Sequence, residues 1–211
     1  MAGLPSASGR RHIRADVRRA VSQCQGDGYC DWMAVYDRDS TVNHPLDFRL
    51  AVGGSVTLFW STEVLRSSVT WLSANGYRLV HLDASKWRDE SDMHTDLASA
   101  LDFPAYYGRN LDALNDCLGD VAVGDYGLTD GDTGLALVIQ RIDLFMRRQP
   151  VVGHHLFDAI AGTAREGALF GNRILCLAQS DDPDLVIPPI GASHVPWNDA
   201  EWLDSKRHPG A

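Results

Sequence analysis

Two short runs of uninterrupted apolar residues constrain the fold of this chain most strongly. They are LALVI at residues 135–139 and ILCLA at residues 174–178. A strand without polar alternation is covered on both faces, which is the situation of strands in a parallel sheet. Between the two runs, a helical pattern extends from Pro150 to Glu166. Strand, helix and strand in this order predict a parallel pair joined by a right-handed crossover.

The same alternation extends towards the N-terminus. Residues 55–60 (SVTLFW) and 77–82 (YRLVHL) have the β-branched and aromatic composition of strands. Between them we predict a helix that is capped by Ser61 or Thr62 and ends at Asn75-Gly76, a pair that favours a left-handed turn. A further helix, capped by Ser91, is predicted over residues 92–101. The fold class is therefore predicted to be α/β, a parallel sheet sandwiched between helices.

The remaining segments are less regular. A short strand is predicted at residues 33–36, followed by a loop through His44-Pro45. A Gly- and Asp-rich connection from Gly119 to Gly134 is predicted to lie at the surface. The tail from Ser180 contains proline and tryptophan, and we predict that it wraps the body and frays at residues 206–208.

The segment from Leu101 to Leu118, LDFPAYYGRNLDALNDCL, is predicted to be displayed by this scaffold. The preceding helix must end before Pro104, because proline pushes the residue before it out of helical geometry. The loop that follows carries two tyrosines and Gly108, which can take a positive φ. A second helix begins after Asn110, a favourable N-cap. Its apolar stripe consists of Leu111, Leu114 and Leu118.

Asp112 and Asp116 lie four residues apart on another face of this helix, about 100–140° around the axis from Leu111. Like charges at this spacing cost a few tenths of a kcal/mol. Asp112 complements the helix dipole, whereas Asp116 lies beyond the first turn and has a weaker structural explanation. Paired carboxylates beside an aromatic loop suit a basic partner. Residue types alone leave a binding surface and a plain solvated face equally open.

The charge of the chain narrows the class of partner. The net charge is −9, and the first 32 residues are basic, with five arginines against three aspartates. Without them, 14 basic and 25 acidic side chains remain, a net charge of −11. Contacts to phosphates need a basic footprint, so this acidic body argues against direct binding of nucleic acid. It favours rapid, salt-sensitive capture of a basic protein.

The four cysteines do not form a disulfide framework in a chain of 211 residues. Cys117 and Cys176 are predicted to be small core residues, and Cys24 with Cys30 lack the second pair that a zinc site needs. We predict no metal and no cofactor. There is no apolar run of 18 residues and no secretory apolar region at the N-terminus, so the expected location is the cytoplasm. Residues 1–32 are predicted to be a disordered basic arm, and Met33 is a candidate for the true start.

The run FPAYYGRNLDALNDCL resembles the signature of the barstar family, the intracellular inhibitors of barnase-type ribonucleases. The similarity is gapless over this run, and family-like order covers residues 77–179. It implies a three-layer sandwich whose sheet has three core strands, at residues 77–82, 135–139 and 174–178. The strand at residues 55–60 is expected to add a fourth, parallel strand. The chain is thus divided into an arm (1–32), an N-terminal extension (33–76), a barstar-like domain (77–179) and a tail (180–211).

The resemblance also implies roles for individual residues. The loop and the acidic helix would block the active site of a basic nuclease, one inhibitor to one enzyme, in the manner of an antitoxin or immunity protein. Asp112 and Asp116 match the two main carboxylates of the family. Asn115 stands where the founding member has a large aromatic residue, and the family's acid on the later helix has no clean counterpart. Gly162 falls near that position. The partner-binding residues implied are Tyr106, Gly108, Asn110, Asp112, Asn115 and Asp116, with Glu166 as a possible additional acid.

Two other functions stay open. A barstar-like interaction module could bind a partner that is not a ribonuclease, with the extension and the tail forming part of a different interface. A metal-dependent hydrolase is the remote alternative, because His154, His155 and Asp158 lie close together in the sequence. Adjacent histidines on a helix point about 100° apart and do not easily bind one ion, so a non-enzymatic protein is predicted. His81 is interpreted as a structural residue of its strand.

Overall fold

The computed structural model describes residues 44–129 and 131–208. The predictions made for the basic arm (1–32), for the strand at 33–36, for Cys24 and Cys30 and for Met33 lie outside these residues. The helices are α2 (Leu46–Val52), α3 (Thr62–Ala74), η1 (a 3₁₀ helix, Ala84–Lys86), α4 (Glu90–Ala100), α5 (Leu111–Val123), α6 (Ile142–Arg148), α7 (Pro150–Phe170) and α8 (Asp204–Arg207). The strands are β1 (Val56–Phe59), β2 (Tyr77–Asp83), β3 (Gly134–Gln140) and β4 (Arg173–Gln179).

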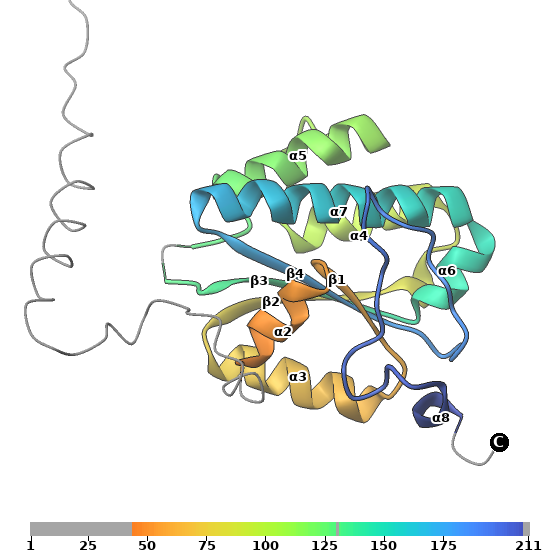
Figure 1. Cartoon of the computed structure of the whole chain (residues 1–211). Coiled ribbons are helices and arrows are strands. Elements are labelled where there is room, and N and C mark those ends of the chain that lie inside the picture. The colour runs from red at the N-terminus through yellow and green to blue at the C-terminus, as the bar shows by residue number, and fades with distance from the viewer. Residues whose placement is uncertain (1–43, 130, 209–211) are drawn as a thin grey trace, which may run out of the picture. The chain divides into compact units, whose positions relative to one another are not determined.

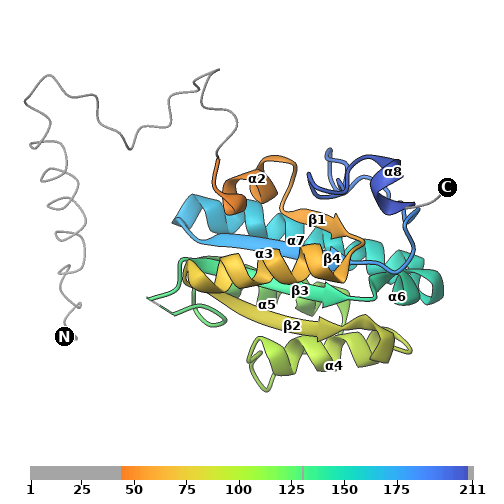
Figure 2. The ribbon, with the colours of Figure 1, turned by 90° about the horizontal axis from the view of Figure 1, so that it is seen from below.

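The four strands form one parallel sheet in the order β1-β4-β3-β2 (Figure 2). This confirms the predicted α/β class and the additional N-terminal strand. That strand, β1, pairs with β4 in the register Val56↔Cys176. The central strands β3 and β4 hold the two apolar runs, and all residues of β3 except its last are buried.

Helices cover both faces of the sheet, and each face has its own hydrophobic core (Figure 1). Helices α4, α5, α6 and α7 cover one face, where Leu135, Leu137 and Ile139 of β3 point. Helices α2 and α3 cover the other face, against Ala136 and Val138. Side chains alternate across a strand, so the continuous apolar run supplies both cores at once.

The predicted boundaries of α3 are confirmed, whereas the predicted start of α4 is wrong, and α7 extends to Phe170, beyond its predicted end at Glu166. The Ser61 side chain caps α3 by accepting hydrogen bonds from the N–H groups of Glu63 and Val64, and Gly76 follows the helix with φ 79°. Helix α4 begins earlier than predicted. Its cap is Asp89 rather than Ser91, because the Asp89 carboxylate accepts a hydrogen bond from Asp92 N at 3.1 Å.

Three further corrections concern two helices that were not predicted, α2 and α6, and the end of α5. The loop predicted through Pro45 leads directly into α2, and α6 was not predicted, because seven residues are too few to show a reliable period. The predicted connection from Gly119 begins five residues later. Helix α5 continues to Val123, buries Val121 and Ala122, and stops at Gly124 with φ 88°.

The C-terminal tail runs along the free edge of β1, as the prediction that it wraps the body requires. Leu58 donates its N–H to Pro196 O, and Leu58 O accepts from Asn198 N at 2.9 Å. The prediction of a frayed end at residues 206–208 is wrong. Residues 204–207 form α8, and the Arg207 guanidinium is 6% exposed and lies 4.5 Å from the ring centre of Trp197. A desolvated cation over an aromatic face is well stabilised, which holds the tail in place.

Candidate protein-binding site

The loop before α5 is anchored by one of its two tyrosines. Tyr107 packs edge-on against Phe103, and its hydroxyl lies 2.5 Å from Nδ1 of His94. His94 belongs to α4 and is completely buried, with Nε2 3.1 Å from the Glu90 carboxylate. Burial is the main cause that raises the pKa of Tyr107 above its usual value. This contact was not predictable from the sequence, because His94 follows no spacing that distinguishes it from the other residues of α4.

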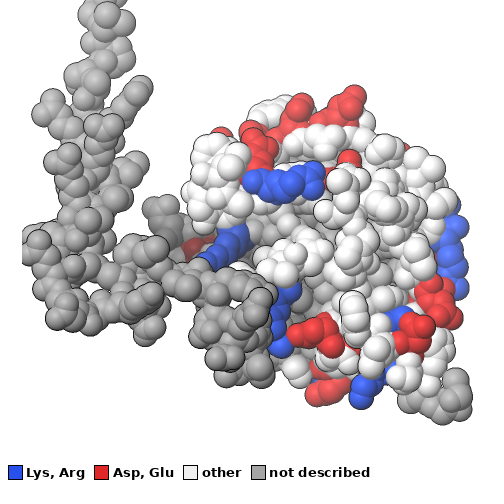
Figure 3. Space-filling view, viewed as in Figure 1, with Lys and Arg blue, Asp and Glu red and all other residues white. Residues whose placement is uncertain are grey.

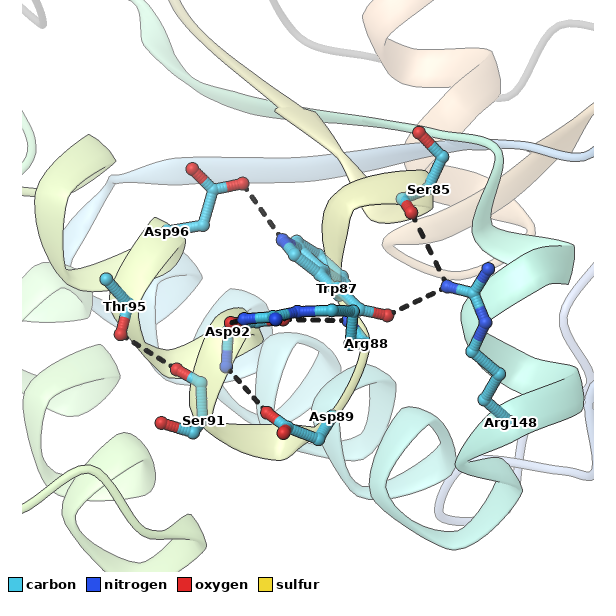
Figure 4. Close-up of polar contacts among 9 residues, drawn as sticks. All are labelled: Ser85, Trp87, Arg88, Asp89, Ser91, Asp92, Thr95, Asp96 and Arg148. Atoms are coloured by element: carbon cyan, nitrogen blue, oxygen red, sulfur yellow. Dashed lines mark hydrogen bonds and ion pairs between the residues drawn. The ribbon is translucent and has the colours of Figure 1, made fainter.

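The start of α4, the helix that carries His94, is held by a set of hydrogen bonds and an ion pair (Figure 4). The buried Trp87 donates its ring N–H to Asp96 at 2.9 Å, and Arg148 donates to the Trp87 carbonyl at 3.0 Å. Arg88 pairs with Asp92 through Nε and a terminal nitrogen, at 2.8 and 3.0 Å. Hydrogen bonds from Arg88 hold the pKa of Asp92 at about 2. The first turn of α4 is therefore a rigid base for the tyrosine loop.

The second tyrosine of the loop points to solvent. The side chain of Tyr106 is 79% exposed, although its neighbour Tyr107 is held in the core. An aromatic side chain that is exposed on a firmly anchored loop is a good contact residue, because little conformational entropy is lost when it binds. The structure thus assigns different positions to two residues that the sequence shows as a pair.

Gly108 does not adopt the positive φ that glycine permits. Positive φ occurs instead at Asp102 (59°) and at Arg109 (49°). Gly108 has a different requirement. A Cβ at this position would lie 3.2 Å from Nδ2 of Asn110 and 3.4 Å from Cβ of Ala113. Glycine therefore lets the loop approach the first turn of α5 closely.

Asn110 caps α5 as predicted. Its Oδ1 accepts a hydrogen bond from Ala113 N at 2.8 Å, and the same side chain remains exposed. The cap satisfies one of the free N–H groups at the start of the helix. It also fixes the direction in which α5 leaves the loop, so Asn110 positions the acidic face whether or not it touches a partner.

The acidic face of α5 is formed by Asp112, Asn115 and Asp116, and all three are exposed. Leu114, Cys117 and Leu118 lie on the buried side of the same helix. The predicted separation of carboxylates and apolar stripe is therefore confirmed. Figure 3 shows acidic side chains gathered at the top of the molecule, along α5.

Helix α7 lies beside α5, and the two helices enclose a groove of about 260 Å³. Asn115 and Gly119 line it from α5, and Asp158, Gly162 and Glu166 line it from α7, where Arg165 also contributes. A Cβ at Gly119 would lie 3.9 Å from a carboxylate oxygen of Glu166. The fold thus brings the predicted additional acid, Glu166, next to the acidic helix.

Asp158 is a further acid of this groove that was not predicted as a binding residue. Asp158, Gly162 and Glu166 recur every four residues, so they follow one face of α7. This spacing is visible in the sequence. That this face lies beside α5, however, is visible only in the tertiary structure.

Helix α5 is fixed against α7 at their C-terminal ends. Asn172 donates from Nδ2 to Ala122 O at 2.8 Å, and a Cβ at Gly167 would lie only 3.0 Å from Asn172 O. Tyr126 donates its hydroxyl hydrogen to Cys117 O at 2.8 Å. The bond from Asn172 fixes the end of α5 beside α7, and the bond from Tyr126 holds α5 at the residue after Asp116.

The other residues that attracted attention in the sequence have ordinary surroundings. Cys117 and Cys176 are free and buried, and burial raises the pKa of the Cys176 thiol. His154 lies 3.1 Å from the carbonyl of Pro189, whereas His155 is exposed, and their ring centres are 6.2 Å apart. His81 is exposed on β2 rather than enclosed.

Within residues 44–129 and 131–208, no three His, Cys, Asp or Glu side chains converge as a metal site would require. In the same residues, no helix is long and apolar enough to cross a membrane.

Comparison with known proteins relates this arrangement to a family. The model of the family described as "Barstar (barnase inhibitor)" matches residues 77–179, from the start of β2 to the end of β4. This match to the barstar family covers just under half of the chain. The match includes the anchored loop, the acidic helix and both walls of the groove.

A curated relative points in the same direction. The protein named "Putative ribonuclease inhibitor YrdF", from Bacillus subtilis (strain 168), is 51% identical over 41 residues. The matched stretch is 19% of this chain and 45% of the relative, so the chain spans about half the length of that protein. Helices α2 and α3, strand β1 and the tail lie outside the barstar match.

Proposed function

We propose that this protein inhibits a basic ribonuclease of the barnase type by placing α5 and the Tyr106 loop in its active site. The observation that carries the proposal is the exposure of Asp112 and Asp116 on one face of α5, within the residues that match the barstar family. A nuclease active site is cationic because it binds phosphate. Carboxylates held in a fixed position can form charge-assisted hydrogen bonds to the same groups.

The geometry suits a partner that is held by preorganised contacts. The loop is anchored through Tyr107, α5 is capped by Asn110, and the helix pair is fixed through Asn172. Tyr106 would pack on the nuclease, and Asp116 would take the central place among its cationic groups. Little ordering is needed on binding, so more of the interaction free energy is available as affinity.

The groove between α5 and α7 suits a basic side chain of the partner. Its walls offer two carboxylates, those of Asp158 and Glu166, against the single cation of Arg165, and Gly119 and Gly162 add no side chains to the lining. A guanidinium can form paired hydrogen bonds with carboxylates in this setting. Asn115→Trp introduces a large aromatic side chain at position 115, and tighter binding of the nuclease by this variant would support an interface that includes this position.

The first experiment measures inhibition of a barnase-type ribonuclease by the wild-type protein and by Asp116→Ala and Asp112→Ala. We expect inhibition by the wild type that weakens as salt is raised. Each substitution should cost about 2–5 kcal/mol of binding free energy, because charges of the nuclease are left unpaired. Glu63→Ala is the matched control, since Glu63 is an exposed acid on α3, across the sheet from α5. If both aspartate variants inhibit as well as Glu63→Ala, α5 is not the inhibitory surface.

The barstar-like module with a different partner is the second candidate. It is favoured by the additional strand β1, the helices α2 and α3 and the ordered tail, which together give this chain surface outside the family match. Binding to a partner that survives the loss of both Asp112 and Asp116 would support it. In either case we propose a non-enzymatic protein that acts as a monomer, one copy to one partner, in the cytoplasm, as an antitoxin or immunity protein does.

A further inference from the structure

One exposed cation interrupts the acidic surface of the loop and α5. Between Phe103 and Val123, Arg109 is the single basic residue, and it stands directly before the cap of α5. Asp112 and Asp116 lie three and seven residues further on. A surface that served only to attract a basic protein would be better without this charge.

The backbone at Arg109 is strained. Its φ is 49°, in the left-handed region that disfavours residues with a Cβ, and Gly108 beside it does not take up the strain. The neighbouring residues impose this conformation. Tyr107 N bonds to Pro104 O at 2.9 Å, and Asn110 holds Ala113 N at 2.8 Å, so Arg109 is the joint between two fixed segments.

Comparison with the other strained positions separates Arg109 from them. Among the described residues, two more that are not glycine have positive φ, Asp102 and Arg141. Each has an ion-pair partner within the chain, Arg78 for Asp102 and Asp83 for Arg141. Arg109 is exposed and has no ion pair or side-chain hydrogen bond within residues 44–129 and 131–208. A strained residue whose side chain has no partner within these residues is a candidate for a role in binding.

We propose that Arg109 determines specificity by pairing with a carboxylate of the partner at the edge of its cationic active site. This inference rests on the proposed function and adds the charge pattern of the partner. The partner surface would be basic where it faces Asp112 and Asp116 and acidic where it faces Arg109. A ribonuclease can present such a pattern, because its phosphate-binding cations surround the general acid and base groups, and a carboxylate is a common general base. The planar guanidinium is suited to a paired contact with that group.

The test is the kinetics of association and dissociation of a barnase-type ribonuclease with the wild type, Arg109→Glu, Arg109→Lys and Arg109→Gly. General attraction alone predicts that Arg109→Glu binds more tightly, because the inhibitor becomes more acidic. A specific pair predicts the opposite, with dissociation at least about tenfold faster and an intermediate effect for Arg109→Lys. Arg109→Gly should bind more weakly although its Tm is equal to or higher than that of the wild type, which excludes misfolding as the cause.

Two controls make the outcome decisive. Arg66→Glu reverses the same charge on α3, across the sheet, and should change only the general electrostatic attraction. A double-mutant cycle with alanine variants of the carboxylates at the active-site edge of the nuclease should show coupling to Arg109 at one of them.

If the wild type inhibits, Asp116→Ala does not, and Arg109→Glu binds as tightly as the wild type, this inference is overturned while the proposed function stands. If the wild type does not inhibit, both are overturned.

Discussion

Two adjacent tyrosines show how much the position of a single residue decides in this protein. Tyr107 is an anchor that joins the loop to the buried His94, whereas Tyr106 is exposed to solvent. The helix pattern after Asn110 was predictable, since a cap and an apolar stripe are local features. Which of the two tyrosines is anchored and which is exposed was not predictable, because the anchor depends on a contact with a histidine 13 residues away.

At this scale we predict that Tyr107→Phe destabilises the fold and loosens the loop. The variant keeps the ring but removes the hydroxyl, which leaves a buried His94 nitrogen without its partner, at a cost of about 1–3 kcal/mol. Urea unfolding measures the loss of stability. Tyr106→Phe is the control and should unfold like the wild type, since its side chain is exposed. Equal stability of both variants would show that the contact with His94 is unimportant.

At the scale of elements, α5 is held in place by contacts at its start, along one side and at its end. Asn110 fixes its first turn, α7 supports one side, and the bond from Asn172 to Ala122 fixes its end. The length of α5 was predicted too short, because Gly119 was interpreted as a helix end. Gly119 instead lies within the helix and lines the groove, where a side chain would approach Glu166.

The cap gives a prediction about this element. Asn110→Ala removes the acceptor for Ala113 N and should cost about 0.5–2 kcal/mol of stability. Asn110→Asp keeps an acceptor and should be as stable as the wild type. We expect weaker binding of the nuclease by the alanine variant, since the start of α5 frays. Calorimetry combined with binding measurements checks both effects, and an alanine variant with unchanged Tm would contradict the role of the cap.

At the scale of the whole molecule, residues far apart in the chain close the edges of the sheet. The tail covers β1, and Glu201, almost fully buried, accepts hydrogen bonds from the N–H groups of Trp60 and Ser61 at 3.0 and 2.7 Å. A free strand edge invites pairing with other chains, so this cover also protects against aggregation. At the opposite end of the sheet, where β2 and β4 begin, the carboxylate of Asp47 in α2 accepts hydrogen bonds from Tyr77 and Arg173.

We predict that Glu201→Gln, which keeps only one carbonyl oxygen, destabilises the protein without changing its affinity for the nuclease. Two buried N–H groups then compete for one strong acceptor, and losing one hydrogen bond to a charged acceptor costs about 1.5–3 kcal/mol. Urea unfolding and the inhibition assay together check the prediction. A loss of affinity in proportion to the loss of stability would show that the tail supports the binding site as well as the edge of β1.

The Asp47–Tyr77–Arg173 group gives a prediction for alkaline pH. Burial, with the hydrogen bond to Asp47 as the next cause, raises the pKa of Tyr77 from 10.0 to about 12. The folded state therefore favours the neutral phenol. Its contribution to stability is complete below pH 10 and is lost as the pH rises towards 12. Tyr77→Phe should lose less stability than the wild type over this interval. Parallel curves of unfolding free energy against pH would contradict the assignment.

Local patterns in the sequence were sufficient to predict the parallel α/β class, the positions of the four strands and the acidic face of α5. Each of these follows from a local period: two apolar runs buried on both faces, and carboxylates set apart from a leucine stripe. The tertiary structure alone decided the strand order β1-β4-β3-β2, the inward turn of Tyr107, and the groove that brings Asp158 and Glu166 to Asn115. The physical reason is that these features depend on contacts between segments distant in the chain, which no local pattern records. The strained, unpartnered Arg109 belongs to the same class, since its φ is imposed by two segments that are fixed elsewhere.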